Sequence, residues 1–297
     1  MDGNILSIVI YGMGGVGKTT LAMHAHDNLL KEPKFSGHVY WITVSQEFSI
    51  HKLQSDIAQA LKLDFSCRSD EKKMAAQLFQ TFQKRGSFVL ILDDVWKQID
   101  AEKIGIPPRR DGCKLVKTSR SKEVCYRMGC QRIIKVNTLS DQEAWELFFK
   151  KLGRVELHPE VEEICKKMVK RCGLPLALVT LVGSMRGVTD IHGWRDALEE
   201  LKQSCMGRAD MENEIFPILL YSYVRLRDPK LQRCLLYCSL YPEDFSIKRE
   251  ELIENFISEE LMDRRLSWRA ENDKGHAILN QLEEPAYWKG FQVGMGM

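Results

Sequence analysis

Short apolar runs alternate with helical patterns along the first 130 residues. Four of these runs predict strands, because apolar runs of about four to eight residues bounded by turn residues are typical of buried strands. They cover residues 6–12, 38–44, 88–94 and 113–119. Helical periodicity falls between them, over residues 18–31, 51–63 and 71–84. Strands that alternate with helices predict an α/β domain with a mainly parallel sheet, which we place over residues 1–135.

The alternation fades after about residue 136, and only helical patterns follow. Residues 140–152 begin with Ser140 and Glu143 at the spacing of a capping box. Residues 160–173 carry apolar side chains at helical spacing and stop at Gly173. Further helical patterns cover residues 175–186, 193–204, 212–226, 230–239 and 249–263. We therefore expect a small helical domain over residues 136–208 and another helical part over residues 209–284.

A glycine-rich loop joins the first predicted strand to the first predicted helix. From Gly12 to Thr19 it fits G-x-x-x-x-G-K-[ST], with Gly17 and Lys18 in place. Glycines let successive backbone N–H groups turn toward phosphate oxygens, the lysine adds a positive charge, and the threonine hydroxyl is suited to Mg²⁺. The predicted phosphate-binding residues are Gly12, Met13, Gly14, Gly15, Val16, Gly17, Lys18, Thr19 and Thr20.

Two acids end the predicted strand FVLILDD at residues 88–94. Alone, this ending is typical of a solvated strand end. About 75 residues after the glycine loop, it favours a carboxylate pair beside the phosphates, because ligands bind at the carboxyl ends of strands in open α/β sheets. We expect Asp93 to serve Mg²⁺ together with Thr19, and Asp94 to orient an attacking water.

The stretch TSR at residues 118–120 ends the next predicted strand. In one interpretation, the Arg120 guanidinium contacts a γ-phosphate and so senses whether that phosphate is present. An ordinary surface arginine is the alternative interpretation, and the residues alone leave both open.

Composition narrows the setting of this site. The net charge of +2 among 297 residues gives no electrostatic argument for nucleic acid or membrane contact, and no apolar run is long enough for a membrane span. The nine cysteines form no CxxC pair and predict reduced thiols in a cytoplasmic protein. The chain has no N-K-x-D sequence for guanine recognition, and no arrangement of Cys, Ser or His residues indicates nucleophilic catalysis.

Five stretches occur in an order that matches one family. They read GMGGVGKTTLA, LILDDVW, KLVKTSRSKEVC, CGLPLAL and RCLLYCSLYPEDFSI. From residue 3 to about residue 284 the chain resembles the nucleotide-binding (NB-ARC) module of plant nucleotide-binding leucine-rich-repeat disease-resistance proteins. Trp96, which closes LDDVW, resembles the coiled-coil class of that family.

The resemblance implies a P-loop domain, a small helical domain and a winged-helix domain. It implies an ADP/ATP switch of the signal-transduction ATPase type in plant defence, with weak ATPase activity that resets the switch and with self-association of the ATP form. Carried over by position, Lys18 and Asp94 serve hydrolysis, Thr19 and Asp93 hold the metal, and Arg120 senses phosphate. Pro175 of GLPLA would pack on the adenine; from the residues alone it is a first helical residue.

The chain departs from the family in three places. Few residues precede the first predicted strand, and the last residues, EEPAYWKGFQVGMGM, do not contain the Met-His-Asp motif. We therefore expect an incomplete winged-helix domain over residues 209–284 and an unrelated tail over 285–297. Lys117 stands where the family has an apolar residue in a buried strand, so it needs to reach solvent or a partner.

Three other interpretations stay open. A P-loop small-molecule kinase fits the glycine loop, although the helical half offers no evident substrate-binding acid or base. A nucleotide-driven winged-helix transcription regulator needs a basic face, and Arg225, Arg227, Lys230 and Arg233 form no sustained one. A degenerate or truncated fragment of a resistance protein is the third.

Overall fold

The computed structural model describes most of the chain, in two compact units. The described residues are 6–32, 35, 37–44, 48–63, 70–107, 113–153, 157–205, 215–241, 245 and 247–283. The units are Met1–Asn137 and Thr138–Met297. The expected tail over residues 285–297 lies outside the described residues. Among the described helices none is long and apolar enough to cross a membrane.

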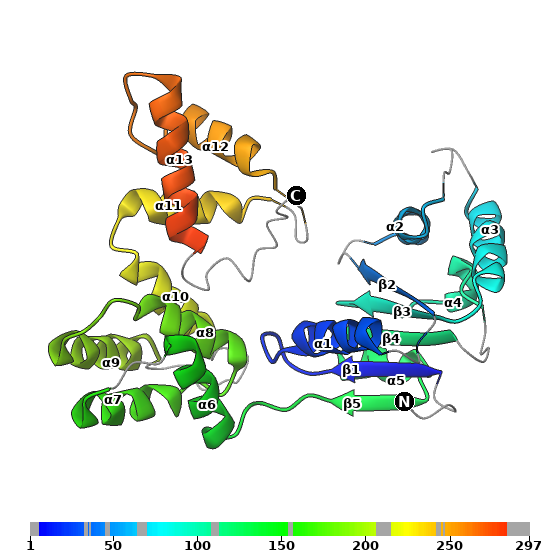
Figure 1. Ribbon diagram of the computed structural model, residues 1–297, viewed down its shortest axis with the longest axis horizontal. Helices are drawn as coiled ribbons and strands as arrows, with labels where there is room; N and C mark the ends of the chain where they lie inside the picture. Colours follow the sequence, from blue (N-terminus) through cyan, green and yellow to red (C-terminus); the bar gives the residue numbers. More distant parts are fainter. Residues whose placement is uncertain are drawn as a thin grey trace. The chain divides into compact units, whose positions relative to one another are not determined.

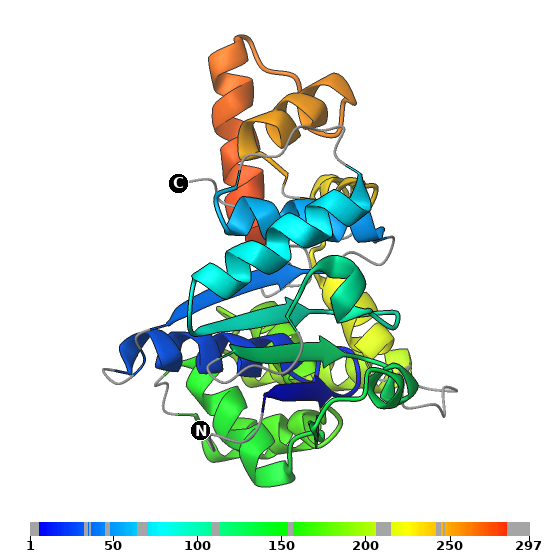
Figure 2. The ribbon, with the colours of Figure 1, turned by 90° about the vertical axis from the view of Figure 1, so that its right-hand side faces the viewer.

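The first unit is built on a five-stranded parallel sheet in the order β2-β3-β4-β1-β5. Its strands are β1 (Ser7–Tyr11), β2 (His38–Thr43), β3 (Phe88–Asp93), β4 (Cys113–Ser119) and β5 (Arg132–Lys135). The strands run in one direction (Figures 1 and 2), so their carboxyl ends share one edge of the sheet. The parallel α/β fold predicted from the alternating pattern is confirmed.

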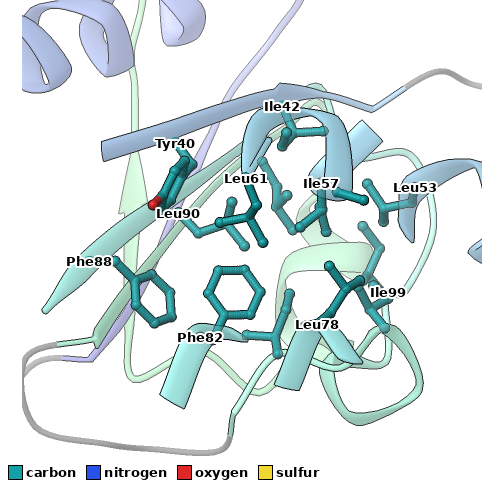
Figure 3. Close-up of a cluster of buried hydrophobic side chains, with 14 of the residues drawn as sticks. Tyr40, Ile42, Leu53, Ile57, Leu61, Leu78, Phe82, Phe88, Leu90 and Ile99 are labelled. Carbon is teal, nitrogen blue, oxygen red and sulfur yellow. The ribbon is translucent and has the colours of Figure 1, made fainter. Parts of the chain in front are cut away.

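Helices cover both faces of this sheet. They are α1 (Lys18–Lys31), α2 (Ile50–Ala60), α3 (Glu71–Lys84), α4 (Ala101–Ile104) and α5 (Lys122–Arg127). On one face, apolar side chains of β1, β3 and β4 pack with Ala22 of α1. On the other face, α2 and α3 pack on β2 and β3, with the stacked rings of Phe82 and Phe88 4.6 Å apart between centroids (Figure 3). Every residue of β3 is buried, so this strand lies within the core of the unit.

The second unit is helical throughout its described residues. Its helices are α6 (Asp141–Leu152), α7 (Pro159–Val169), α8 (Pro175–Ser184), α9 (Ile191–Cys205), α10 (Ile215–Arg225), α11 (Pro229–Cys238), α12 (Arg249–Ser258) and α13 (Trp268–Glu283). The capping box predicted at the start of α6 is present, with Ser140 and Glu143 bonded reciprocally. Pro175 is the first residue of α8, as the helical pattern predicts.

The helices of the second unit form two groups. α6 to α9 pack on one another, and α10 joins them through contacts with α8 and α9. α11, α12 and α13 enclose a separate core around Leu252, Ile253 and Phe256, which are fully buried. We therefore propose a boundary near Asp228 rather than at residues 208–209. The winged-helix interpretation of the last group stays a prediction.

Candidate nucleotide-binding site

The site lies where three neighbouring strands of the first unit end. β3, β4 and β1 are adjacent and parallel, so the segments that follow them meet at the same edge. The glycine loop follows β1, the two acids close β3, and the TSR stretch closes β4. The glycine loop is thereby brought to the two acids, with Thr19 and Asp93 lying 74 residues apart in the sequence, and the TSR stretch to the same acids, with Asp93 and Thr118 lying 25 residues apart. The structure places every predicted site residue in this unit except Pro175.

The glycine loop takes a conformation that side chains would obstruct. Gly15 and Gly17 have φ angles of +73° and +97°, in the left-handed region that favours glycine. A Cβ on Gly12 would lie 2.7 Å from the carbonyl oxygen of Val136, so the loop begins against backbone. No side chain caps α1 at Gly17, which leaves its first N–H groups available to an anion.

Lys18 points back into this loop. Its Nζ donates a hydrogen bond to the carbonyl oxygen of Met13 at 2.9 Å, and the residue is only 6% exposed. Burial lowers the pKa of the Lys18 ammonium, and the positive charge of Arg120 lowers it further, while Asp94 and Asp93 act in the opposite direction. A phosphate group in the loop would supply the negative charge that a buried ammonium favours.

Asp93 is held in a hydrogen-bonded network beneath the loop. Its Oδ1 accepts from the hydroxyl of Thr118 at 2.5 Å and from the hydroxyl of Thr19 at 3.2 Å. The Thr118 hydroxyl also accepts from the backbone N–H of Asp94 at 2.8 Å. Burial raises the pKa of the Asp93 carboxyl, although its two hydroxyl donors partly offset that shift. Thr19 and Asp93, predicted to act together, are therefore in direct contact.

The donor set around Asp93 fits Mg²⁺. Carboxylate and hydroxyl oxygens are the ligands this ion prefers, and it usually keeps several waters and phosphate oxygens besides one or two protein ligands. No group of three or more His, Cys, Asp or Glu side chains suited to a metal ion is found in the described parts of the chain. A cation at Thr19 and Asp93 would thus depend on phosphates and water for the rest of its shell.

Asp94 and Arg120 are joined directly. The Nη2 of Arg120 donates to Oδ2 of Asp94 at 3.3 Å, and the Nε1 of Trp96 donates to the same oxygen at 3.1 Å. Asp94 has a φ of +56°, which is unusual for a residue with a side chain and is often found at functional sites. The predicted acid and the predicted phosphate sensor therefore share one carboxylate oxygen.

Two residues that sequence reasoning did not select complete the site. Thr118 and Ser119 are both fully buried at the end of β4. The Ser119 hydroxyl donates to the carbonyl oxygen of Val95 at 2.6 Å, and its own carbonyl accepts from the N–H of Gly12 at 3.3 Å. Both lie in the TSR stretch. The sequence feature that could have indicated them is the pair of hydroxyl residues directly before Arg120 at a strand end.

The remaining predicted residues divide between the units. Val16 is buried and Thr20 is exposed in the first turn of α1. Pro175 belongs to the second unit, so its assignment to the adenine stays a prediction. Lys117, expected to reach either solvent or a partner, is only 3% exposed; burial lowers the pKa of its ammonium, and the thiols of Cys130 and Cys125 act against that shift.

Comparisons with known proteins identify relatives of the chain. The model of the NB-ARC domain family matches residues 1–158. At4g10780 of Arabidopsis thaliana, named as a disease resistance protein, is 40% identical over 291 residues, which cover 95% of this chain and 32% of that protein. The disease resistance protein RPS5 of the same plant is 36% identical over 281 residues, 92% of this chain and 31% of that protein. The chain thus spans about a third of the length of these curated relatives.

A search of solved structures finds more distant similarity. The crystal structure of Cdc6p from Pyrobaculum aerophilum has a TM-score of 0.49 and 15% sequence identity, covering 94% of this chain and 79% of that chain.

Proposed function

The chain belongs to the NB-ARC domain family and binds nucleotide, and from that premise we propose that it is an ADP/ATP switch of the signal-transduction ATPase type that acts in plant defence. The relatives named for disease resistance support the setting. In this proposal ADP holds the resting form, exchange for ATP permits self-association, and slow hydrolysis resets the protein.

The observation that carries the proposal is the pairing of Asp94 with Arg120. An enzyme with fast turnover needs its acid free to orient water. Here the acid is neutralised by the cation that would sense the γ-phosphate, 3.3 Å away. Hydrolysis then depends on Arg120 leaving Asp94 for the phosphate, which couples the reaction to the presence of a terminal phosphate, as a switch requires.

Each residue of the site has a part in this proposal. Gly12 to Thr20 hold the phosphates through backbone N–H groups, and Lys18 neutralises their charge. Thr19 and Asp93 would hold Mg²⁺, which supplies charge neutralisation at the phosphates when bound. Asp94 orients the attacking water, and Arg120 contacts the terminal phosphate.

The proposal is tested by nucleotide binding and by the identity of bound nucleotide. We expect ADP or ATP to co-purify with the protein and to be released on denaturation. Lys18→Ala should weaken ADP binding about 10- to 100-fold, the range for one lost charge-assisted contact. Lys31→Ala, at the exposed far end of the same helix, is the matched control and should leave the affinity unchanged.

Two results would contradict this assignment. Equal ADP affinity in Lys18→Ala and Lys31→Ala protein would remove the glycine loop as the phosphate site. Phosphorylation of an added small molecule at ordinary enzyme rates of about 10 s⁻¹ would favour the kinase interpretation instead.

A further inference from the structure

Trp96 contacts both members of the Asp94–Arg120 pair. Its indole Nε1 donates to Oδ2 of Asp94 at 3.1 Å, the oxygen that also accepts from Arg120. The guanidinium carbon of Arg120 lies 4.6 Å from the centroid of the Trp96 ring. The three side chains therefore form a closed set in which every member contacts the other two.

Trp96 contacts the side chain of Asp94, whereas the backbone contact of Asp94 restrains only its main chain. The backbone of Asp94 is fixed by the bond from its N–H to Thr118, but that bond leaves the side-chain torsions of Asp94 free. The carboxylate is held by the indole N–H and by the guanidinium of Arg120. The ring face of tryptophan is also the best aromatic surface for a guanidinium, and the planar cation can stay on it while its N–H groups change partners.

We infer that Trp96 is a positioning residue that couples phosphate sensing to hydrolysis. It holds the carboxylate of Asp94 in one orientation while Arg120 moves along the indole face from Asp94 to a terminal phosphate. Oδ2 of Asp94 then loses Arg120 as a donor and can orient water, while the indole N–H keeps the carboxylate aligned. This inference rests on the proposed function of the site.

Packing alone does not account for this arrangement. A side chain that merely filled space would need no N–H toward Asp94, and a half-buried position such as that of Trp96 would accept many apolar residues. Instead the polar edge of the ring faces the acid and its face carries the cation. Trp96→Phe removes the N–H and keeps an aromatic face, whereas Trp96→Leu removes both, so the two contributions are separable.

The test measures binding and hydrolysis separately in these variants. In Trp96→Phe we expect the dissociation constants of ADP and ATP to stay within about twofold, because the phosphates are held by the loop, and single-turnover ATP hydrolysis to fall about tenfold. In Trp96→Leu we expect, in addition, a loss of about 2- to 30-fold in the preference for ATP over ADP, the range for one cation–π contact.

Trp41→Phe is the matched control for the loss of an indole N–H. Trp41 is partly buried on β2 of the same unit, and its Nε1 donates to Thr43 at 3.4 Å. Binding and hydrolysis in this variant should equal those of the wild type. A general effect of losing an indole on the stability of the unit would appear in Trp41→Phe as well.

A second background tests whether Trp96 acts through Asp94. If it does, Trp96→Phe should add no further loss to Asp94→Asn. Equal fold losses in both backgrounds, wild-type hydrolysis in Trp96→Phe, or equal weakening of ADP and ATP in Trp96→Leu would each overturn the inference while the switch stands. Wild-type protein that binds no nucleotide would overturn both the inference and the proposed function.

Discussion

Replacing Thr118 with valine removes one hydroxyl from the centre of the site and leaves its shape nearly unchanged. The hydroxyl is fully buried, donates to Oδ1 of Asp93 at 2.5 Å and accepts from the N–H of Asp94 at 2.8 Å. Valine can do neither. The buried carboxylate of Asp93 then keeps only Thr19 as a side-chain donor among the described residues, and the amide of Asp94 loses this acceptor.

The expected cost follows from these two bonds. A hydrogen bond to a charged group contributes about 1.5–3 kcal/mol and a neutral one about 0.5–1.5 kcal/mol, so Thr118→Val should lower the free energy of unfolding by about 2–4 kcal/mol. For a unit of this size each kcal/mol corresponds to roughly 4 °C, which predicts a fall in Tm of about 8–16 °C.

The loss should depend on pH because Asp93 titrates. The Thr118 hydroxyl lowers the pKa of Asp93, so its removal raises further a pKa that burial already holds above 3.8. A carboxyl whose pKa is raised by folding costs stability as the pH rises from the pKa of the unfolded chain to the raised pKa of the folded chain. The penalty of Thr118→Val should therefore be larger at pH 8 than at pH 3.5, where Asp93 is mostly protonated in the unfolded as well as in the folded chain.

Calorimetry on the full chain can follow the transition of each unit separately. Thr180→Val is the matched control, because Thr180 is fully buried in α8 and its hydroxyl has no hydrogen-bond partner among the described residues. Removing an unsatisfied hydroxyl should leave the second unit unchanged or raise its stability by about 1 kcal/mol. A loss below about 1 kcal/mol in Thr118→Val, or equal losses in both variants, would refute the reasoning.

Two further substitutions test the burial of charge and the close packing of the loop. Lys117→Met should raise the free energy of unfolding of the first unit by about 1–3 kcal/mol at pH 7, measured by urea unfolding. The gain should shrink toward pH 10. Burial lowers the pKa of the wild-type lysine below 10.5, so this lysine loses its proton at a lower pH in the folded chain than in the unfolded chain. A constant or growing gain would contradict this. Gly12→Ala should lower the Tm and weaken ADP binding, because the added Cβ would lie 2.7 Å from the Val136 carbonyl oxygen. Gly14→Ala is the control and should leave the Tm unchanged, because a Cβ on Gly14 meets nothing within 4 Å. Equal thermal stability of the two alanine variants would show that the loop tolerates this approach.

Sequence patterns predicted the elements that have a clear internal period. Four strands and the helix after the glycine loop lie within a residue or two of the predicted ranges. The pattern does not predict β5, because this strand is only four residues long and charged residues flank its two isoleucines. The predicted helical patterns end at residue 263 and do not include α13, because polar residues dominate the first half of that helix. The packing of α10 on α8 and α9 is a tertiary property that no local pattern contains.

The sequence motifs predict the glycine loop and the two acids, which the structure brings to one edge of the sheet, but they do not predict the residues that contact them. The glycine loop and the two acids follow from motifs whose chemistry constrains residue type. The role of Thr118 depends on the register between β3 and β4, in which Leu92 pairs with Lys117 and Thr118 then reaches Asp93. The partners of Trp96 likewise depend on the end of a neighbouring strand, which the LDDVW stretch alone does not indicate.

The contacts of the site also limit how much of a switch it can supply. In the proposed switch, a diphosphate would compete with the Met13 carbonyl for Lys18, whereas a terminal phosphate would also have to draw Arg120 from Asp94. That pair costs about 0–1 kcal/mol to separate, because the Arg120 side chain is 46% exposed and screened by solvent. A new charge-assisted bond returns about 1.5–3 kcal/mol, which leaves a preference for ATP of roughly 0.5–3 kcal/mol. Moving an equilibrium from 1:99 to 99:1 requires about 5.5 kcal/mol, so at least about 2.5 kcal/mol of the difference between the two forms has to come from contacts beyond Arg120.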